Sequence, residues 1–162
     1  MGAANKDLNI KKVVQTKSAT LARPNSSSIE ENILRDLTEH IRQGGNEFKL
    51  ALYTDQATLS KSTTAYTSSN EVANGNGYTT KGAALTNVTP ALSGDTACCD
   101  FADVSFTSAS FTTRGCLIYN ETASGDPSVC AIDFGGDKTV SSGTFTIQFP
   151  TADASNAILR IA

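Results

Sequence analysis

Apolar and polar residues alternate along much of the chain after residue 46, and this pattern predicts β-strands. Phe48, Leu50 and Leu52 share one face of a first strand, with Ala51 and Tyr53 on the other face. The fold class that follows is mainly β, an antiparallel β-sandwich of about eight strands. We expect strands at 48–53, 82–88, 98–105, 115–120, 128–134, 144–149 and 156–162, with a brief pairing at 65–67.

The centre of the predicted sheet is an antiparallel hairpin formed by residues 115–120 and 128–134. Both runs carry apolar side chains on both faces, as strands in a covered sheet do, and a polar connector rich in turn-forming residues separates them. This arrangement places Cys116 roughly opposite Cys130, as neighbouring but reduced thiols. We expect a tight turn at 135–138 and a loop at 89–95.

The first 45 residues have a different pattern and predict a separate N-terminal region, with the β-sandwich domain at 46–162. Residues 1–28 have no periodic apolar face, so we expect an extended arm that is ordered only in an assembly. A capping box at residues 28–31 and the Gly44-Gly45 pair delimit one amphipathic helix at about 29–43. Its apolar stripe either covers an open edge or face of its own sandwich or packs against helices of other copies. The stripe consists of Ile29, Ile33, Leu37 and Ile41.

Charge is unevenly distributed along the chain, although the net charge is only −3. Residues 1–28 contain five basic residues and one acidic residue, whereas the rest of the chain is acidic. The arm is therefore either a solvated tail or a segment that docks on an acidic neighbouring surface. An acidic body with few arginines makes nucleic-acid binding unlikely, because phosphate contacts need clustered cations.

The sequence contains no recognisable catalytic or metal-binding pattern, so we expect a protein that is not an enzyme and uses no cofactor. The single histidine, His40, lies in the predicted helix, away from any serine or cysteine nucleophile. The four cysteines lack metal-ligand spacing, and most aspartates fall in predicted turns. A calcium site among Asp95, Asp100 and Asp103 fits no known loop spacing. No apolar run is long enough to span a bilayer.

Several segments resemble a family of small virion structural proteins of tailed bacteriophages. The likeness covers about residues 46–162, in order and without large gaps. Its N-terminal half rests on FKLALY and AYTSSNEVANGNGYTTKGAAL, and its C-terminal half on FADVSF, TTRGCLIYN, AIDFGGDKT, GTFTIQFP and NAILRIA.

The resemblance implies a structural component of the virion that is assembled in the host cytoplasm. Small size and an N-terminal arm favour a head decoration or cement protein, bound to the major capsid protein or other virion proteins and present there as a homo-oligomer. The alternative within the same class is a neck or tail accessory protein. A carbohydrate-binding sandwich is a weaker alternative, because the chain has no tryptophan and only four tyrosines. The expected partner-binding residues are the aliphatics of the N-terminal region, Ile10, Val13, Val14, Ile29, Ile33, Leu37 and Ile41.

Overall fold

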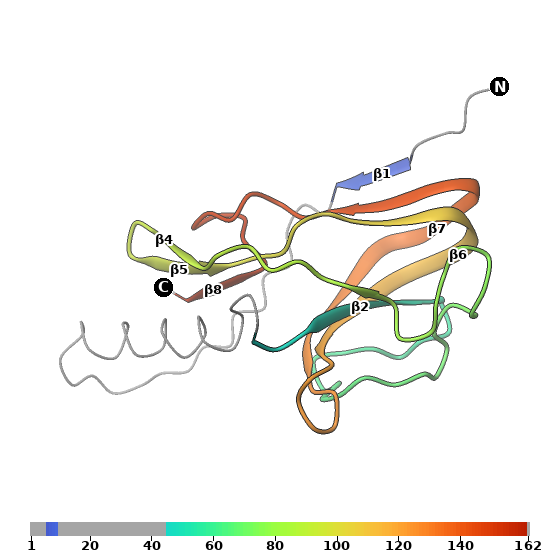
Figure 1. Ribbon diagram of the computed structural model, residues 1–162, viewed down its shortest axis with the longest axis horizontal. Coiled ribbons are helices and arrows are strands. Elements are labelled where there is room, and N and C mark those ends of the chain that lie inside the picture. Colours follow the sequence, from blue (N-terminus) through green and yellow to red (C-terminus); the bar gives the residue numbers. More distant parts are fainter. Residues whose placement is uncertain (1–5, 10–44, 162) are drawn as a thin grey trace.

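The computed structural model describes residues 6–9 and 45–161, and in these ranges the protein is mainly β, as predicted (Figure 1). The larger sheet has the strand order β1-β7-β6-β2-β3, and the smaller one has the order β4-β5-β8. All pairings are antiparallel except that of β1 with β7. The helix expected at 29–43 lies outside the described residues. The strands are β1 (Lys6–Asn9), β2 (Phe48–Tyr53), β3 (Ala83–Ala84), β4 (Ala91–Ser93), β5 (Thr96–Cys99), β6 (Val104–Asn120), β7 (Ser128–Gln148) and β8 (Leu159–Ile161).

The long β6–β7 hairpin dominates the larger sheet, and it contains an irregularity that the sequence pattern did not predict. Thr113 pairs with Lys138 and Gly115 pairs with Asp133, so the single residue Arg114 lies opposite four residues of β7. The expected turn at 135–138 is therefore wrong as a strand boundary, since β7 continues through it to Gln148. The physical reason is that extra residues on one strand can bulge outward and bend the ladder without ending it.

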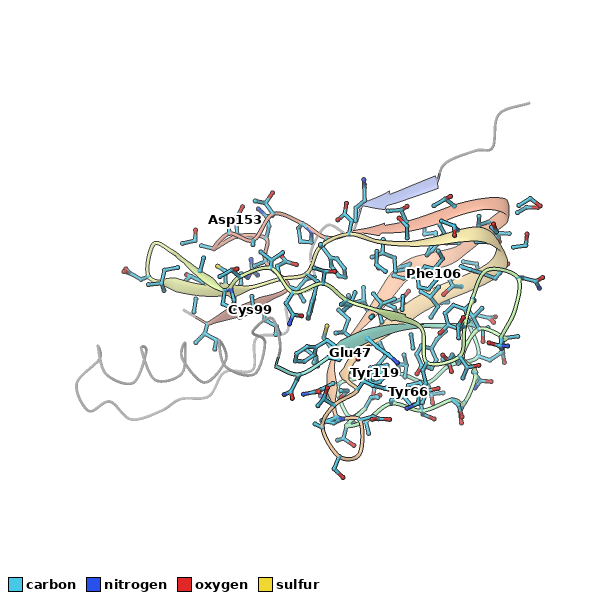
Figure 2. The ribbon with its side chains drawn as sticks, viewed as in Figure 1. Glu47, Tyr66, Cys99, Phe106, Tyr119 and Asp153 are labelled. Atoms are coloured by element: carbon cyan, nitrogen blue, oxygen red, sulfur yellow. The ribbon has the colours of Figure 1, made fainter. Side chains whose placement is uncertain are left out.

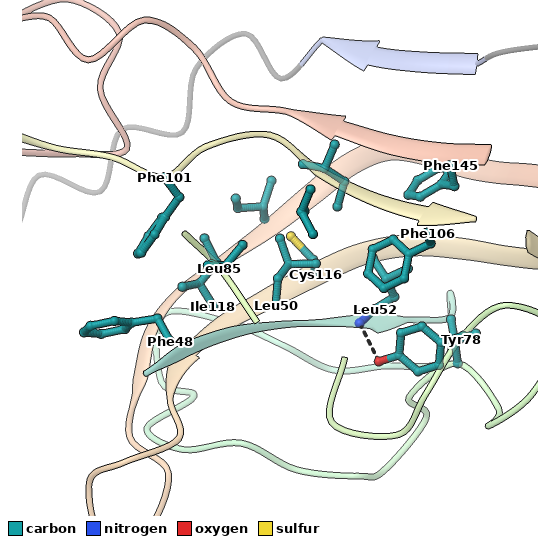
Figure 3. Packing of buried hydrophobic residues seen from close by; sticks show 14 of the residues in the cluster. Phe48, Leu50, Leu52, Tyr78, Leu85, Phe101, Phe106, Cys116, Ile118 and Phe145 are labelled. Atoms are coloured by element: carbon teal, nitrogen blue, oxygen red, sulfur yellow. Dashed lines mark hydrogen bonds between the residues drawn. The ribbon is translucent and has the colours of Figure 1, made fainter. Parts of the chain in front are cut away.

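The main hydrophobic core lies between the two halves of this bent hairpin. Phe106 and Phe145 come from the half nearest the ends of the hairpin, and Leu50 and Ile118 come from β2 and the other half of β6. Figure 3 shows the two phenylalanines on one side of the cluster and the aliphatic side chains on the other. The alternation predicted for 144–149 is confirmed here, because Phe145 and Ile147 are both buried. One bent sheet thus supplies two layers around one core.

A second, smaller cluster lies on the opposite face of β2 and β6. It contains Ala51, Tyr53, Leu117 and Tyr119, all buried. The predicted division of β2 into two faces is therefore confirmed, with Phe48, Leu50 and Leu52 in the main core. Both faces of these central strands are covered, which explains why their sequences are apolar throughout.

The hairpin register differs from the predicted one at the two cysteines. Cys116 pairs with Ile132, and Cys130 pairs with Ile118, so the thiols are diagonal neighbours on one face instead of direct partners. The difference arises at the loop end of the hairpin. There the side chain of Asn120 accepts hydrogen bonds from the N–H groups of Thr122 and Ala123, both at 3.1 Å, and a register shift follows between Ile118 and Tyr119. All four cysteines are buried and free.

The region between residues 82 and 99 also differs from the expected strands. The strand expected at 82–88 is reduced to β3, and the loop expected at 89–95 contains β4. Ser93 pairs with Thr96 across Gly94-Asp95, with Gly94 at φ 62°. Such a two-residue connection with a positive φ at its first position is a hairpin turn, so a glycine signal was present in the sequence but was interpreted as a loop.

Four residues of the expected arm are part of the sheet of the body. β1 pairs in parallel with the edge of β7, with Leu8 opposite Ile147. The expectation that the arm is ordered only in an assembly is wrong for these four residues. An edge strand presents unpaired N–H and C=O groups, and another extended segment can satisfy them.

Gly82 provides a test of the packing at the free edge of β2. Its φ is +75°, and an added Cβ would lie 1.9 Å from the carbonyl oxygen of Leu50. We expect Gly82→Ala to lower the free energy of unfolding by about 3 kcal/mol or more, measured by denaturant unfolding. Gly125→Ala is the matched control, because Gly125 also has a positive φ (+84°) but open space around the Cβ position. The control should lose only about 1 kcal/mol, and equal losses in both variants would contradict the close packing.

Candidate functional site

The main polar cluster of the described residues surrounds Glu71, at the edge of β2. The Glu71 carboxylate accepts hydrogen bonds from the hydroxyl groups of Tyr66 and Tyr78, both at 2.6 Å. It also accepts the backbone N–H of Lys81 at 2.7 Å. The Tyr78 hydroxyl in turn accepts the backbone N–H of Leu52 at 3.0 Å. Glu71 therefore joins three points of the segment 54–82 to the edge of β2.

All four tyrosines of the chain contribute to this region, which we call the tyrosine cluster: Tyr53, Tyr66, Tyr78 and Tyr119 with Glu71. Tyr53 donates to the carbonyl of Thr67 at 2.6 Å. The Tyr66 and Tyr119 rings pack with their centroids 4.8 Å apart, and Figure 2 shows the two side by side. Three of the rings are buried and Tyr66 is half-buried, so the cluster offers no exposed aromatic platform for a sugar.

An ion-pair network extends the tyrosine cluster towards the 121–127 loop. The Lys81 ammonium lies 2.9 Å from Glu121 and 3.4 Å from Asp126, and Lys49 of β2 lies 3.3 Å from Glu121. The backbone carbonyl of Lys81 accepts the Tyr119 hydroxyl at 2.8 Å. The hydrogen bond with Glu121 raises the pKa of Lys81. Burial opposes ionisation of Glu121, but hydrogen bonds from Lys81, Tyr119 and Lys49 outweigh it and lower its pKa.

These contacts stabilise neutral phenols and paired ions. Burial, followed by the negative charge of Glu71, raises the pKa of Tyr53, and burial together with the hydrogen bond to Glu71 raises the pKa of Tyr66 and Tyr78. A phenol with a raised pKa stays protonated at neutral pH, so it does not supply a nucleophile or a base. The chemistry of the tyrosine cluster is thus that of a clamp, which holds the segment 54–82 against β2 and β6.

A shallow cleft lies beside Tyr53, between the segment 54–61 and the bend of the hairpin. Its volume is about 190 Å³, and Leu59, Lys61, Arg114 and Asp133 contribute to its lining. Ligand pockets usually have volumes of about 300–1,000 Å³, so this cleft is small for an organic ligand. Its guanidinium is already engaged, because Arg114 contacts Asp133 at 3.2 Å and Asp137 at 3.7 Å.

The buried thiols and carboxylates outside the tyrosine cluster also have ordinary structural partners. Burial raises the pKa of Cys99 to about 11 and that of Cys130 to about 12, so these thiols are protonated at neutral pH. Asp100 accepts the N–H of Phe101 at 2.8 Å, and Asp103 accepts the N–H of Phe149 at 2.9 Å. Within residues 6–9 and 45–161, no group of three or more His, Cys, Asp or Glu side chains could hold a metal ion.

The residues that the sequence singled out for partner binding lie outside the described residues. They are Ile10, Val13, Val14, Ile29, Ile33, Leu37 and Ile41. Conversely, sequence reasoning missed the tyrosine cluster. Glu71 lies in a polar stretch without periodicity, and no local pattern indicates that Tyr66, Tyr78 and Lys81 converge on it.

Comparison with protein families, curated proteins and solved structures finds no match to this chain. In the part of the chain that the structure describes, no helix is long and apolar enough to cross a membrane.

The clamp role of Glu71 can be tested by substitution. Glu71→Ala removes the acceptor of two tyrosine hydroxyls and one backbone N–H, and we expect it to lower the free energy of unfolding by roughly 2–4 kcal/mol. Tyr66→Phe removes one of these hydrogen bonds and should cost about 1 kcal/mol. The control Glu47→Ala, at an exposed carboxylate, should change stability by less than about 0.5 kcal/mol. A loss at Glu71 no larger than the control would refute the clamp.

Asp100 makes stability depend on pH. It is only 2% exposed, and burial raises its pKa from 3.8 to about 6. The folded state therefore holds the proton between about pH 4 and pH 6 while the unfolded state has lost it. The stabilisation is complete below pH 4 and is lost as the pH rises through 6. Asp100→Asn removes this dependence.

We expect the stability difference between Asp100→Asn and wild type to shift in favour of the variant by on the order of 1–3 kcal/mol from pH 4 to pH 7. Denaturant unfolding at several pH values measures it. Using the difference between the two proteins cancels the opposite slopes from Asp133, Asp153 and Glu121, whose pKa values are lowered. A pH-independent difference would contradict the prediction.

Proposed function

We propose that this protein is a non-enzymatic structural component of a tailed-phage virion, a head decoration or cement protein bound to the capsid surface through its N-terminal region. Its partners are the major capsid protein or other virion proteins, and it is a homo-oligomer in the particle, with no cofactor. A neck or tail accessory protein is the second candidate, because the resemblance to virion proteins does not distinguish these locations.

The observation that carries this proposal is the parallel addition of β1 to the edge of β7. The N-terminal region can form main-chain hydrogen bonds along a sheet edge, which is a common way for one protein to join another. The same edge chemistry is available on a neighbouring subunit. The aliphatics of the N-terminal region then supply apolar contacts, either to the partner or to the protein's own body.

The form of the body also supports a structural role. Its two layers of strands enclose one core, and on this basis we assign the body to the β-sandwich class. The segments that resemble virion proteins coincide with its central strands, since FKLALY is β2 and TTRGCLIYN forms the end of β6. The tyrosine cluster adds rigidity on the outer face, and its buried rings weigh against a carbohydrate-binding role.

The test is to add full-length protein to particles assembled without it and to measure its position and occupancy by cryo-electron microscopy. Wild-type protein should appear at regular positions on the head. The triple variant Ile10→Asp, Val13→Asp and Val14→Asp should bind at least about tenfold more weakly, because each buried aliphatic contributes roughly 1.5–3 kcal/mol before ordering costs.

The matched control is Thr16→Asp, Ser18→Asp and Thr20→Asp, which makes the same change of charge in the same arm without removing an aliphatic. It should reduce binding much less than the first triple variant. Density at the neck or tail would replace the head assignment with the second candidate. No density for wild-type protein anywhere on the particle would refute the virion proposal.

A further inference from the structure

The smaller sheet carries an apolar surface that extends beyond the main core. Leu92 is 63% exposed and Ile161 is 44% exposed, and they are two of the three exposed large hydrophobic residues in the described chain. Leu92 pairs with Ala97 of β5, and Ala97 pairs with Ile161 of β8. Direct cross-strand partners lie on the same face of a sheet, so these three residues form one continuous row, here called the apolar row.

The apolar row lies on the same side of the sheet as the main core. Ala97 and Cys99 point to one face of β5, because alternate residues of a strand share a face. Cys99 is buried in the main core, and its partner Leu159 packs against that core. The row therefore prolongs the core face outward, past the point where the larger sheet covers it.

The N-terminal region joins the body beside this row. The Phe48 ring, at the start of β2, lies 5.8 Å from the Phe101 ring, and Phe101 follows the end of β5 by two residues. Figure 3 shows Phe48 and Phe101 facing each other at this end of the core. Residue 45 precedes Phe48 by three residues, so at most about 11 Å of chain separates it from the foot of the smaller sheet.

We propose that residues 29–43 form an amphipathic helix that covers the apolar row of its own chain. The stripe of Ile29, Ile33, Leu37 and Ile41 is the apolar face, and Gly44-Gly45 connects it to the start of β2. A 15-residue helix is about 22 Å long, and three strands span about 10 Å, so one helix is long enough to cross the row. This contact does not depend on the virion assignment. It refines that proposal by leaving residues 1–28 as the part that reaches a partner.

Hydrogen exchange of the isolated full-length protein tests the contact. The amides of residues 29–43 should be protected in wild-type protein, to the same degree at low and high protein concentration. The variant Leu92→Lys, Ile161→Lys places two charges in the apolar row at exposed positions, and it should lower the protection factors of residues 29–43 by about tenfold or more.

The matched control is Ala91→Lys. Ala91 is exposed on the same smaller sheet, but it pairs with Cys98 and therefore lies on the opposite face. The control should leave the protection of residues 29–43 unchanged, and amides of β6 should stay protected in every variant as a measure of intact folding. Absence of protection in wild-type protein, or equal protection in the double variant, would overturn the proposal. Protection that increases with protein concentration would also overturn it, because the occupant would then be a second copy.

Discussion

At Arg114 one residue of β6 faces four residues of β7, and the hairpin bends there so that its two halves enclose the same apolar side chains. Burial of apolar surface is the main favourable contribution to folding, and a single flat hairpin would leave one face of each strand in water. The bend brings Phe106 and Phe145 over Ile118 and the β2 residue Leu50. The other strands of the larger sheet add to a core that the hairpin has already formed.

The bend also determines what must cover the outer face. β2 and β6 carry apolar side chains on both sides, so Ala51, Tyr53, Leu117 and Tyr119 need a second cover. The described chain provides it with the irregular segment 54–82, whose backbone has few partners in the sheets. Glu71 compensates for this by accepting hydrogen bonds from two tyrosines and one backbone amide. The tyrosine cluster is thus the polar counterpart of the core beneath it.

The described body and the N-terminal region have different roles in our interpretation. The body has its ionisable groups in stable pairs and its thiols protonated, which suits a component that must remain folded and unreactive. The pairing of β1 with β7 and the apolar row give two places where the N-terminal region can contact the body. Assembly then depends on how the chain divides that region between its own surface and its neighbours.

The sequence by itself determined the β class, the two faces of β2 and the buried central strands, because alternation of side chains follows directly from strand geometry. Only the tertiary structure decided the register at Cys116 and Cys130, since one bulge next to Asn120 shifts all the pairs beyond it. It also decided the bend at Arg114 and the convergence of four tyrosines around Glu71. Those features depend on contacts between residues far apart in the chain, such as Tyr119 with Lys81, and local patterns carry no information about them.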